Sequence, residues 1–160
     1  MANVNTMLPL QVVYDINAYI GTSQAEGGGE WTYAPLGAGI DNLGEALNET
    51  VNQYFFLNDK GFANNYVTGM APTFTMSGRR VIGDAAQEYI FGKKYQLGEN
   101  RLSNFKLEYT NADGATVTMT ANCTIANMQE WQGAPNDASA ISFELRFNGQ
   151  PVVTTTPAGA

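Results

Sequence analysis

The feature that most constrains the fold is an unbroken alternation of apolar and polar residues over 115–125. Its odd positions, from Ala115 to Ile125, are all apolar, and its even positions are all Thr or Asn. Successive side chains of a β-strand point to opposite faces of the sheet, so this period of two predicts a long strand with one buried face. Cys123 falls on the apolar face, where an unpaired cysteine serves as a small hydrophobic filler.

Shorter alternations on both sides of this strand extend the β pattern. Residues 104–109 and 141–147 each place large apolar side chains at every second position, and 111–114 (NADG) is typical of a hairpin turn. An alternation over 12–20 and the aromatic segment 30–34 predict two further strands, separated by a glycine-rich loop. The chain is therefore expected to be mainly β, with loop from 128 to 139 and a short extended piece and tail from Pro151 onward.

The segment Val67–Gly92 predicts one long strand, a tight corner and the only convincing helix. In the strand, apolar residues such as Phe74 alternate with hydroxyl residues up to Arg79. Asp84 is a good N-cap, and Gln87 three residues later completes a capping-box pattern for a short helix over about 84–92. Two turns of helix are unstable alone, so this helix must dock on a sheet. The expected apolar stripe is Ala85, Ala86, Tyr89 and Ile90, with Tyr89 and Ile90 as the docking residues.

Residues 35–65 carry the weakest pattern and leave two structures open. Helical spacing of Leu43, Ala46 and Leu47 permits a helix over 42–53, although Gly44 would cost it about 1 kcal/mol. We favour strand and loop instead, with residues 51–57 and 64–67 forming an exposed hairpin. Its tip would be the turn Asn58, Asp59, Lys60 and Gly61, in which Gly61 supplies a positive φ, followed by Phe62. Phe62 could pack locally or anchor an interface.

Composition excludes several classes of function. The net charge is −7 with only 8 Lys and Arg, which argues against binding nucleic acid through phosphates. Arg79 and Arg80 point to opposite faces of a strand, so we expect ion-pair or surface roles for them. Histidine is absent and Cys123 is the single cysteine, so no catalytic, cofactor or metal site is expected. No run approaches the ~18 apolar residues of a membrane span. The low content of charged residues, 14%, favours self-association.

Three blocks in a fixed order carry a resemblance to a known family. They are the strand VTGMAPTFTMSGR from Val67 to Arg79, the helix segment GDAAQEYIF from Gly83 to Phe91, and ISFELRFNGQPV from Ile141 to Val152. Over roughly residues 65–153 the chain resembles the tail tube, or major tail, proteins of long-tailed bacteriophages. Residues 1–60 match only in general character.

This resemblance implies two packed antiparallel sheets, a β-sandwich or split barrel, with one short flanking helix near 84–92. The chain would be a single domain over 1–160, with an N-terminal arm (about 1–10), a long loop or hairpin (about 35–65) and a C-terminal tail (about 153–160). Subunits of this family form rings, usually hexamers, that stack into a tube around a channel for the genome. Residues 58–62 are then the candidate inter-ring loop. The Thr and Asn face of 115–125 could line the channel or face solvent.

The resemblance also implies partners and a location. The chain would bind further copies of itself and the tape measure, tail terminator and distal tail proteins, and DNA would pass through without specific binding. It would be assembled in the host cytoplasm and reside in the tail of the virion, with no membrane partner and no cofactor. The alternative is another β-rich virion protein or an adhesin-like binding module. Deleting the segment 35–65 discriminates between these functions, because only the tube subunit needs it for assembly.

Overall fold

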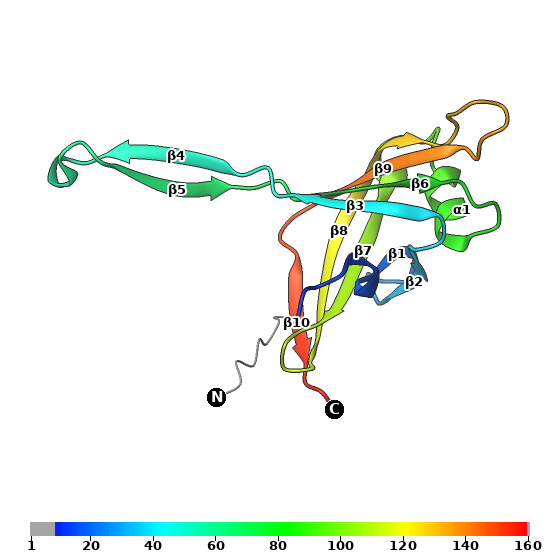
Figure 1. The fold of residues 1–160 in the computed structure, drawn as a ribbon, viewed down its shortest axis with the longest axis horizontal. Helices are drawn as coiled ribbons and strands as arrows, with labels where there is room; N and C mark the ends of the chain where they lie inside the picture. Colours follow the sequence, from blue (N-terminus) through cyan, green and yellow to red (C-terminus); the bar gives the residue numbers. More distant parts are fainter. Residues whose placement is uncertain (1–8, 160) are drawn as a thin grey trace, which may run out of the picture.

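The computed structural model describes residues 9–159, and their fold is mainly β, as predicted. Figure 1 shows a twisted body of strands with a helix at one end and a long two-stranded arm at the other. The strands are β1 (Asn17–Gln24), β2 (Trp31–Pro35), β3 (Ile40–Ala46), β4 (Thr50–Phe55), β5 (Ala63–Gly69), β6 (Thr73–Arg79), β7 (Leu102–Thr110), β8 (Thr116–Gln129), β9 (Ala140–Phe147) and β10 (Val152–Thr156). The helix α1 spans Ala85–Gly92, and short 3-10 helices span η1 (Val13–Asp15), η2 (Leu57–Asp59) and η3 (Gly98–Arg101).

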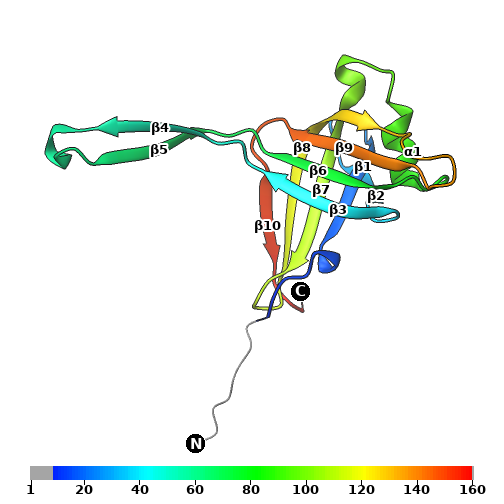
Figure 2. The same ribbon diagram turned by 45° about the horizontal axis from the view of Figure 1, so that its top comes forward.

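The body is one antiparallel sheet in the order β2-β1-β7-β8-β9-β6-β3, and it bends at β8 until its two halves face each other. The first part of β8 pairs with β10, and the part from Cys123 onward pairs with β9. The change of partner falls between Thr120 and Cys123, and a bulge after Ala126, with Asn127 at φ 49°, bends the strand further along its pairing with β9. Figure 2 shows β7 and β8 crossing the direction of β9, β6 and β3. The predicted pair of packed antiparallel layers is thereby confirmed, and β4 and β5 form a separate two-stranded sheet.

The core lies between the two halves of the bent sheet. The rings of Phe74 on β6 and Phe105 on β7 have centroids 5.0 Å apart, which joins the halves directly. Phe105, Phe143 and Ile125 are fully buried, as is Cys123 on the predicted apolar face of β8. Burial of a large apolar side chain contributes about 1.5–3 kcal/mol, so these residues hold the layers together.

The predicted long strand over Val67–Arg79 is wrong in one respect, because it breaks into β5 and β6. Pro72 provides the physical reason. It has no N–H to donate to a ladder, and it restricts the backbone of the preceding residue. The break separates a strand of the arm from a strand of the body. Within residues 9–159, β5 pairs only with β4, whereas β6 pairs with β3 and β9.

The segment 35–65 is strand and turn, and the helix considered over 42–53 does not form. Its first part is β3, which pairs with β6 from Ile40 to Ala46 and so belongs to the body. Only the part after Ala46 leaves the body. The pairing of Leu43 with Met76 places Leu43 against the core, and tertiary packing thus overrides its helical spacing.

Three further boundaries differ from the sequence-based expectations. The strand expected over 12–20 begins only at Asn17, because residues 13–15 form η1, in which the N–H of Ile16 donates to the carbonyl of Val13. β8 continues to Gln129, into the expected loop at 128–139. Residues 153–156, expected to be a tail, pair with β8 as part of β10. The expected N-terminal arm, about 1–10, falls mostly outside the described residues.

Candidate self-assembly surfaces

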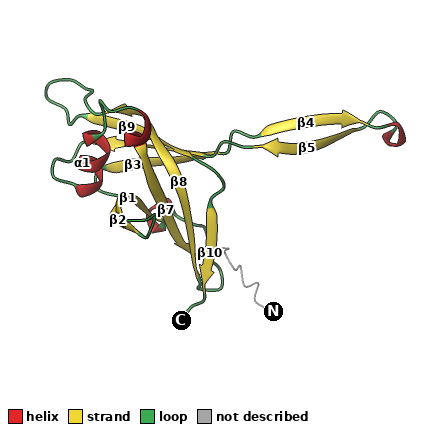
Figure 3. Ribbon diagram, turned by 180° about the vertical axis from the view of Figure 1, so that it is seen from behind, coloured by secondary structure: helices red, strands yellow, loops and turns green. Residues whose placement is uncertain are grey.

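The arm formed by β4 and β5 is the most exposed regular element of the molecule. The two strands pair from Thr50 with Gly69 to Phe55 with Ala63. Figures 1 and 3 show the arm extending straight away from the body, on the side opposite α1. Every residue of β4 is exposed, and the contacts that Tyr54 makes with Phe56 and Tyr66 stay within the arm and leave it 47% exposed.

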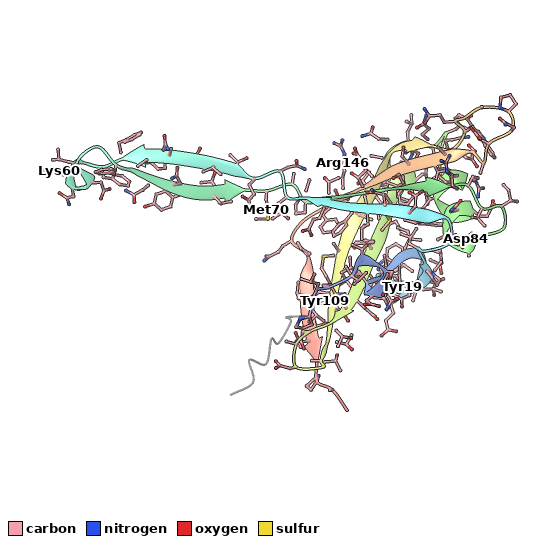
Figure 4. All side chains as sticks on the ribbon, viewed as in Figure 1. Tyr19, Lys60, Met70, Asp84, Tyr109 and Arg146 are labelled. Atoms are coloured by element: carbon pink, nitrogen blue, oxygen red, sulfur yellow. The ribbon has the colours of Figure 1, made fainter. Side chains whose placement is uncertain are left out.

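The tip of the arm is an ordered turn built by the expected residues 58–62. Lys60 (φ 53°) and Gly61 (φ 93°) both adopt left-handed backbone, and the N–H of Phe62 donates to the carbonyl of Asp59 at 3.0 Å. The side-chain amide of Asn64 donates to the carboxylate of Asp59 and ties the turn to β5. Figure 4 places Lys60 at the far end of the arm and Met70 at its base. The turn therefore presents a defined surface at the far end of the arm.

The surface at the tip of the arm consists largely of apolar side chains that are exposed to solvent. Leu57 is 89% exposed and Phe62 is 79% exposed, and Phe55 and Phe56 beside them are at least half exposed. Contiguous exposed apolar surface of this kind marks an interaction site. Of these residues, Phe62 was expected from the sequence to be exposed, whereas Leu57 and Phe56 were not singled out. The signal was available, because four consecutive apolar residues at 54–57 break the alternation of a strand with one solvated face.

The base of the arm fixes the direction in which it leaves the body. Asn48 takes a left-handed φ of 50° and donates its side-chain amide to the carbonyl of Ala71 at 2.9 Å. The N–H of Ala71 in turn donates to the carbonyl of Leu47 at 2.8 Å. These bonds bridge the two chain segments that enter and leave the arm, so we expect the arm to keep its orientation relative to β3 and β6.

The strand β10 presents a second surface suited to association. It pairs with β8 on one side only, and all five of its residues are exposed. Its sequence, VVTTT, contains no charged residue and no proline, which are the usual means of blocking an open strand edge. The open edge of β3, by contrast, carries Asp41 and Glu45. Among the described edge strands of the large sheet, β10 is thus the one that carries neither a charged residue nor a proline, since β2 contains Pro35.

The helix is anchored at the opposite end of the body by its cap and its buried face. The carboxylate of Asp84 accepts a hydrogen bond from the N–H of Gln87 at 3.1 Å, which places Asp84 as the N-cap. The reciprocal half of the capping box does not form. The Gln87 side chain is instead fully buried, accepts from the N–H of Val81 at 2.8 Å and donates to the carbonyls of Ala38 and Arg79. The Gln87 side chain thereby joins the helix to the segment before it, at Val81, and to the loop between β2 and β3, at Ala38.

The helix buries a face displaced from the expected stripe. Ile90 is fully buried, whereas Tyr89 is only partly buried and donates its hydroxyl to the Oγ of Ser103 at 3.3 Å. Ala85, expected in the stripe, is exposed, and Phe91 is buried in its place. The ring of Phe91 meets that of Phe143 edge-on, with centroids 6.3 Å apart. The buried face of the helix therefore runs through Ala86, Gln87, Ile90 and Phe91.

Arg80 is the centre of a charged network beside the helix, and it fits the expected ion-pair role. Its guanidinium donates to Glu88 and to Glu130, each at 2.9 Å, and Lys94 donates to the other oxygen of Glu130 at 2.7 Å. Burial opposes the charge on Glu130, but hydrogen bonds from Lys94 and Arg80 outweigh it and lower its pKa. The bond from the N–H of Gly83, followed by that from Arg80, lowers the pKa of Glu88. All four charges are used inside this network, which ties α1 to the loop after β8.

The described residues show neither a cluster of metal ligands nor a reactive cysteine. Within 9–159 no group of three or more Cys, Asp and Glu side chains is placed to hold a metal ion. Burial raises the pKa of the Cys123 thiol to about 12, so its thiolate is scarcely populated at neutral pH. In the same part of the chain, no helix has the length and apolar character needed to cross a bilayer.

Solved structures of tail tubes share this fold. A subunit from the tail of an empty gene transfer agent particle with C6 symmetry matches with a TM-score of 0.65 and 13% identity, over 91% of this chain and 99% of that one. The SPP1 tail tube protein matches with a TM-score of 0.62 and 16% identity, over 91% of this chain and 78% of that one.

A tube-terminating protein matches over an even larger share of the chain. The cap of the anti-feeding prophage matches with a TM-score of 0.56 and 15% identity, over 99% of this chain and 100% of that one. No protein-family model and no curated protein matches the sequence. The resemblance noted from sequence is therefore confirmed at the level of the fold, which is that of subunits from phage-type tail tubes and tube caps.

Proposed function

We propose that the chain is the repeating structural subunit of a bacteriophage tail tube, in which rings of identical subunits stack around a channel for the genome. The shared fold supports this, since the solved structures that match it come from tail tubes and tube ends. The C6 symmetry of the gene transfer agent tail supports six subunits in each ring. The role is structural rather than catalytic.

The observation that carries the proposal is the arm of β4 and β5. It projects from the body with Leu57 and Phe62 exposed at its tip, although a folded monomer gains nothing from exposing them. In a stacked tube the arm of one ring would reach the adjacent ring, and residues 58–62 would lie in the contact between rings. Association would cover the apolar side chains and supply the stabilisation that they lack in the monomer.

The open edge of β10 and the net charge fit the same role. Pairing of strand edges between neighbouring subunits would remove the unprotected edge by closing the sheets around a ring. A ring of six copies at −7 each would carry a net charge of about −42, so the tube would let DNA pass without gripping it. Its further partners would be the tape measure, tail terminator and distal tail proteins, with assembly in the host cytoplasm and final residence in the virion.

Electron microscopy of the concentrated protein tests the proposal. We expect rings or tubes with a central hole, in a fraction that grows with concentration. Replacing residues 50–69 with a short Gly-Ser turn should leave the body folded and abolish tubes, because only the arm is removed. A protein that stays monomeric at every concentration would refute the proposal. Tubes that survive loss of the arm would instead assign the arm to binding another molecule.

A further inference from the structure

A groove of about 470 Å³ lies where the bent sheet fails to close on itself. Its floor consists of apolar side chains from the residue before β1, from β3 and from β6, including Ile16, Ile40, Leu43 and Met76. Val13 and Tyr14 of η1 form one rim and are 58% and 82% exposed. The open edge of β3 forms the other rim, because β3 ends the order of the sheet. The groove is therefore an apolar slot with unpaired backbone along one wall.

The charges around this groove are acidic. Asp41 lines it from β3, and Asp15 belongs to the same 3-10 turn as Val13 and Tyr14. No Lys or Arg is among the residues that line it. An occupant with apolar side chains and one positive charge would thus fit the site better than an acidic one.

The tip of the arm has that chemistry. It presents Leu57 and Phe62 as exposed apolar side chains, with Lys60 between them in the turn. The neighbouring carboxylate, on Asp59, keeps its negative charge but is directed toward the side-chain amide of Asn64, from which it accepts a hydrogen bond. Lys60 has no ion-pair partner among the described residues, so its charge can be used by another chain.

We propose that the tip of the arm of one copy docks in this groove of the next copy, with Leu57 and Phe62 over the apolar floor and Lys60 beside Asp41. The proposal rests on the proposed function and adds the partner surface for the arm. A molecule cannot fill its own groove in this way, because the arm runs straight away from its own body (Figures 1 and 3).

This contact joins two different surfaces, the tip and the groove, and so it is heterologous. A heterologous contact leaves unused tips at one end of a stack and unused grooves at the other, and it therefore propagates from ring to ring. Docking would also cover the open edge of β3, whose side chains Asp41 and Glu45 only partly protect it. The tip of the arm and the groove would then be the two complementary surfaces of one contact between subunits.

A charge exchange tests the pairing of Lys60 with Asp41. K60E and D41K should each raise the protein concentration needed for tube formation by about tenfold, through unlike charges becoming like. The double variant K60E/D41K should return this concentration to near the parental value. D113K, which reverses an exposed charge in the turn between β7 and β8, is the matched control and should assemble as the parent does. Single variants that weaken assembly without rescue in the double variant would overturn the pairing.

A disulfide trap tests the position of the tip directly. Cys123, the single cysteine of the chain, is buried, so new exposed cysteines can be oxidised selectively. L57C and V13C, prepared separately and mixed before assembly, should form a heterodimer on oxidation, and neither variant should do so with the parent. V153C replaces L57C in a parallel mixture, and a crosslink only there would place β10 in the groove instead. Tubes without the L57C–V13C crosslink would overturn this inference alone, whereas a parent that never assembles would overturn the proposed function with it.

Discussion

The body and the arm are both built from antiparallel strands rich in apolar side chains, but the body buries these side chains and the arm exposes them. In the body, Phe105 and Phe143 are fully buried between the two halves of the sheet. In the arm, Phe55 is 63% exposed and Phe62 is 79% exposed, and the partner strand offers them no second layer. An isolated two-stranded ribbon is at best marginally stable in water. The comparison indicates that the body is folded by its own core, whereas the arm is shaped for contact with another molecule.

This difference between the body and the arm predicts how substitutions in each should affect stability and assembly. Substitutions in the body should change the free energy of unfolding of the monomer, and substitutions at the tip of the arm should change assembly and leave that free energy nearly constant.

Ile90→Asp should destabilise the monomer by about 4 kcal/mol or more, because it removes a buried apolar side chain and buries an unpaired charge. Ile90 belongs to α1 and is fully buried in the core. Ile82→Asp is the matched control, since Ile82 is 73% exposed and its replacement should cost about 0.5 kcal/mol or less. Urea unfolding measures both. Tyr89→Asp should fall between them because Tyr89 is only partly buried. Equal midpoints for Ile90→Asp and the parent would show that the helix is not docked.

Gln87→Ala should cost about 3 kcal/mol, because it leaves the N–H of Val81 and the carbonyls of Ala38 and Arg79 without their side-chain partner. Gln87→Glu is the informative companion. It keeps the acceptor for the N–H of Val81 and loses the donor to the two carbonyls. Gln87→Glu should therefore also lower the free energy of unfolding at neutral pH, where the carboxylate is ionised and cannot donate. Thermal unfolding of the three proteins gives the comparison. A parental melting temperature for Gln87→Ala would mean that the side chain contributes no net stability.

Glu130→Gln should reduce stability at neutral pH by about 2 kcal/mol and flatten its dependence on pH in acid. The folded protein holds the pKa of Glu130 below its ordinary value near 4.5, through Lys94 and Arg80. The ionised carboxylate therefore stabilises the fold above about pH 4.5, and this contribution is lost as the pH falls through the lower folded pKa.

Urea unfolding of the parent and Glu130→Gln between pH 7 and pH 3 measures the difference in slope. Lys94→Met should flatten the acid slope in part, since Arg80 still pairs with Glu130. Parallel profiles for the parent and Glu130→Gln would contradict this assignment.

Much of the body could be predicted from the sequence because its strands have one buried face. The alternation over 115–125 and that over 141–147 correspond to β8 and β9, and the odd positions of both lie toward the core. Asp84 could be identified as a cap because the helix start depends on local bonding. Features that depend on distant parts of the chain were not predicted. The burial of Gln87 is set by carbonyls at Ala38 and Arg79, and no local pattern encodes them.

The candidate surfaces were predictable only in part, for a related reason. The turn at 58–62 has a local signal in Gly61, so the tip of the arm could be expected. The groove beside β3 combines η1, β1, β3 and β6, which lie up to about sixty residues apart, and exists only because the sheet fails to close. The alternation of Val12 and Tyr14 suggested a strand there, yet Tyr14 is 82% exposed. An alternating pattern does not distinguish side chains that are buried in the core of their own chain from exposed side chains that are available to contact another chain.

The tip variants Phe62→Ser and Leu57→Ser should change the free energy of unfolding least, by about 0.5 kcal/mol or less, because both side chains are already exposed. They should nevertheless raise the concentration at which rings or tubes form, since association loses apolar contact area in every joint. Tyr95→Ser is the matched control on the body, where Tyr95 is 90% exposed, and it should assemble normally. Sedimentation velocity and urea unfolding on the same samples separate the two effects. If Phe62→Ser destabilises the monomer as Gln87→Ala does, the tip packs on its own chain and the contrast between body and arm fails.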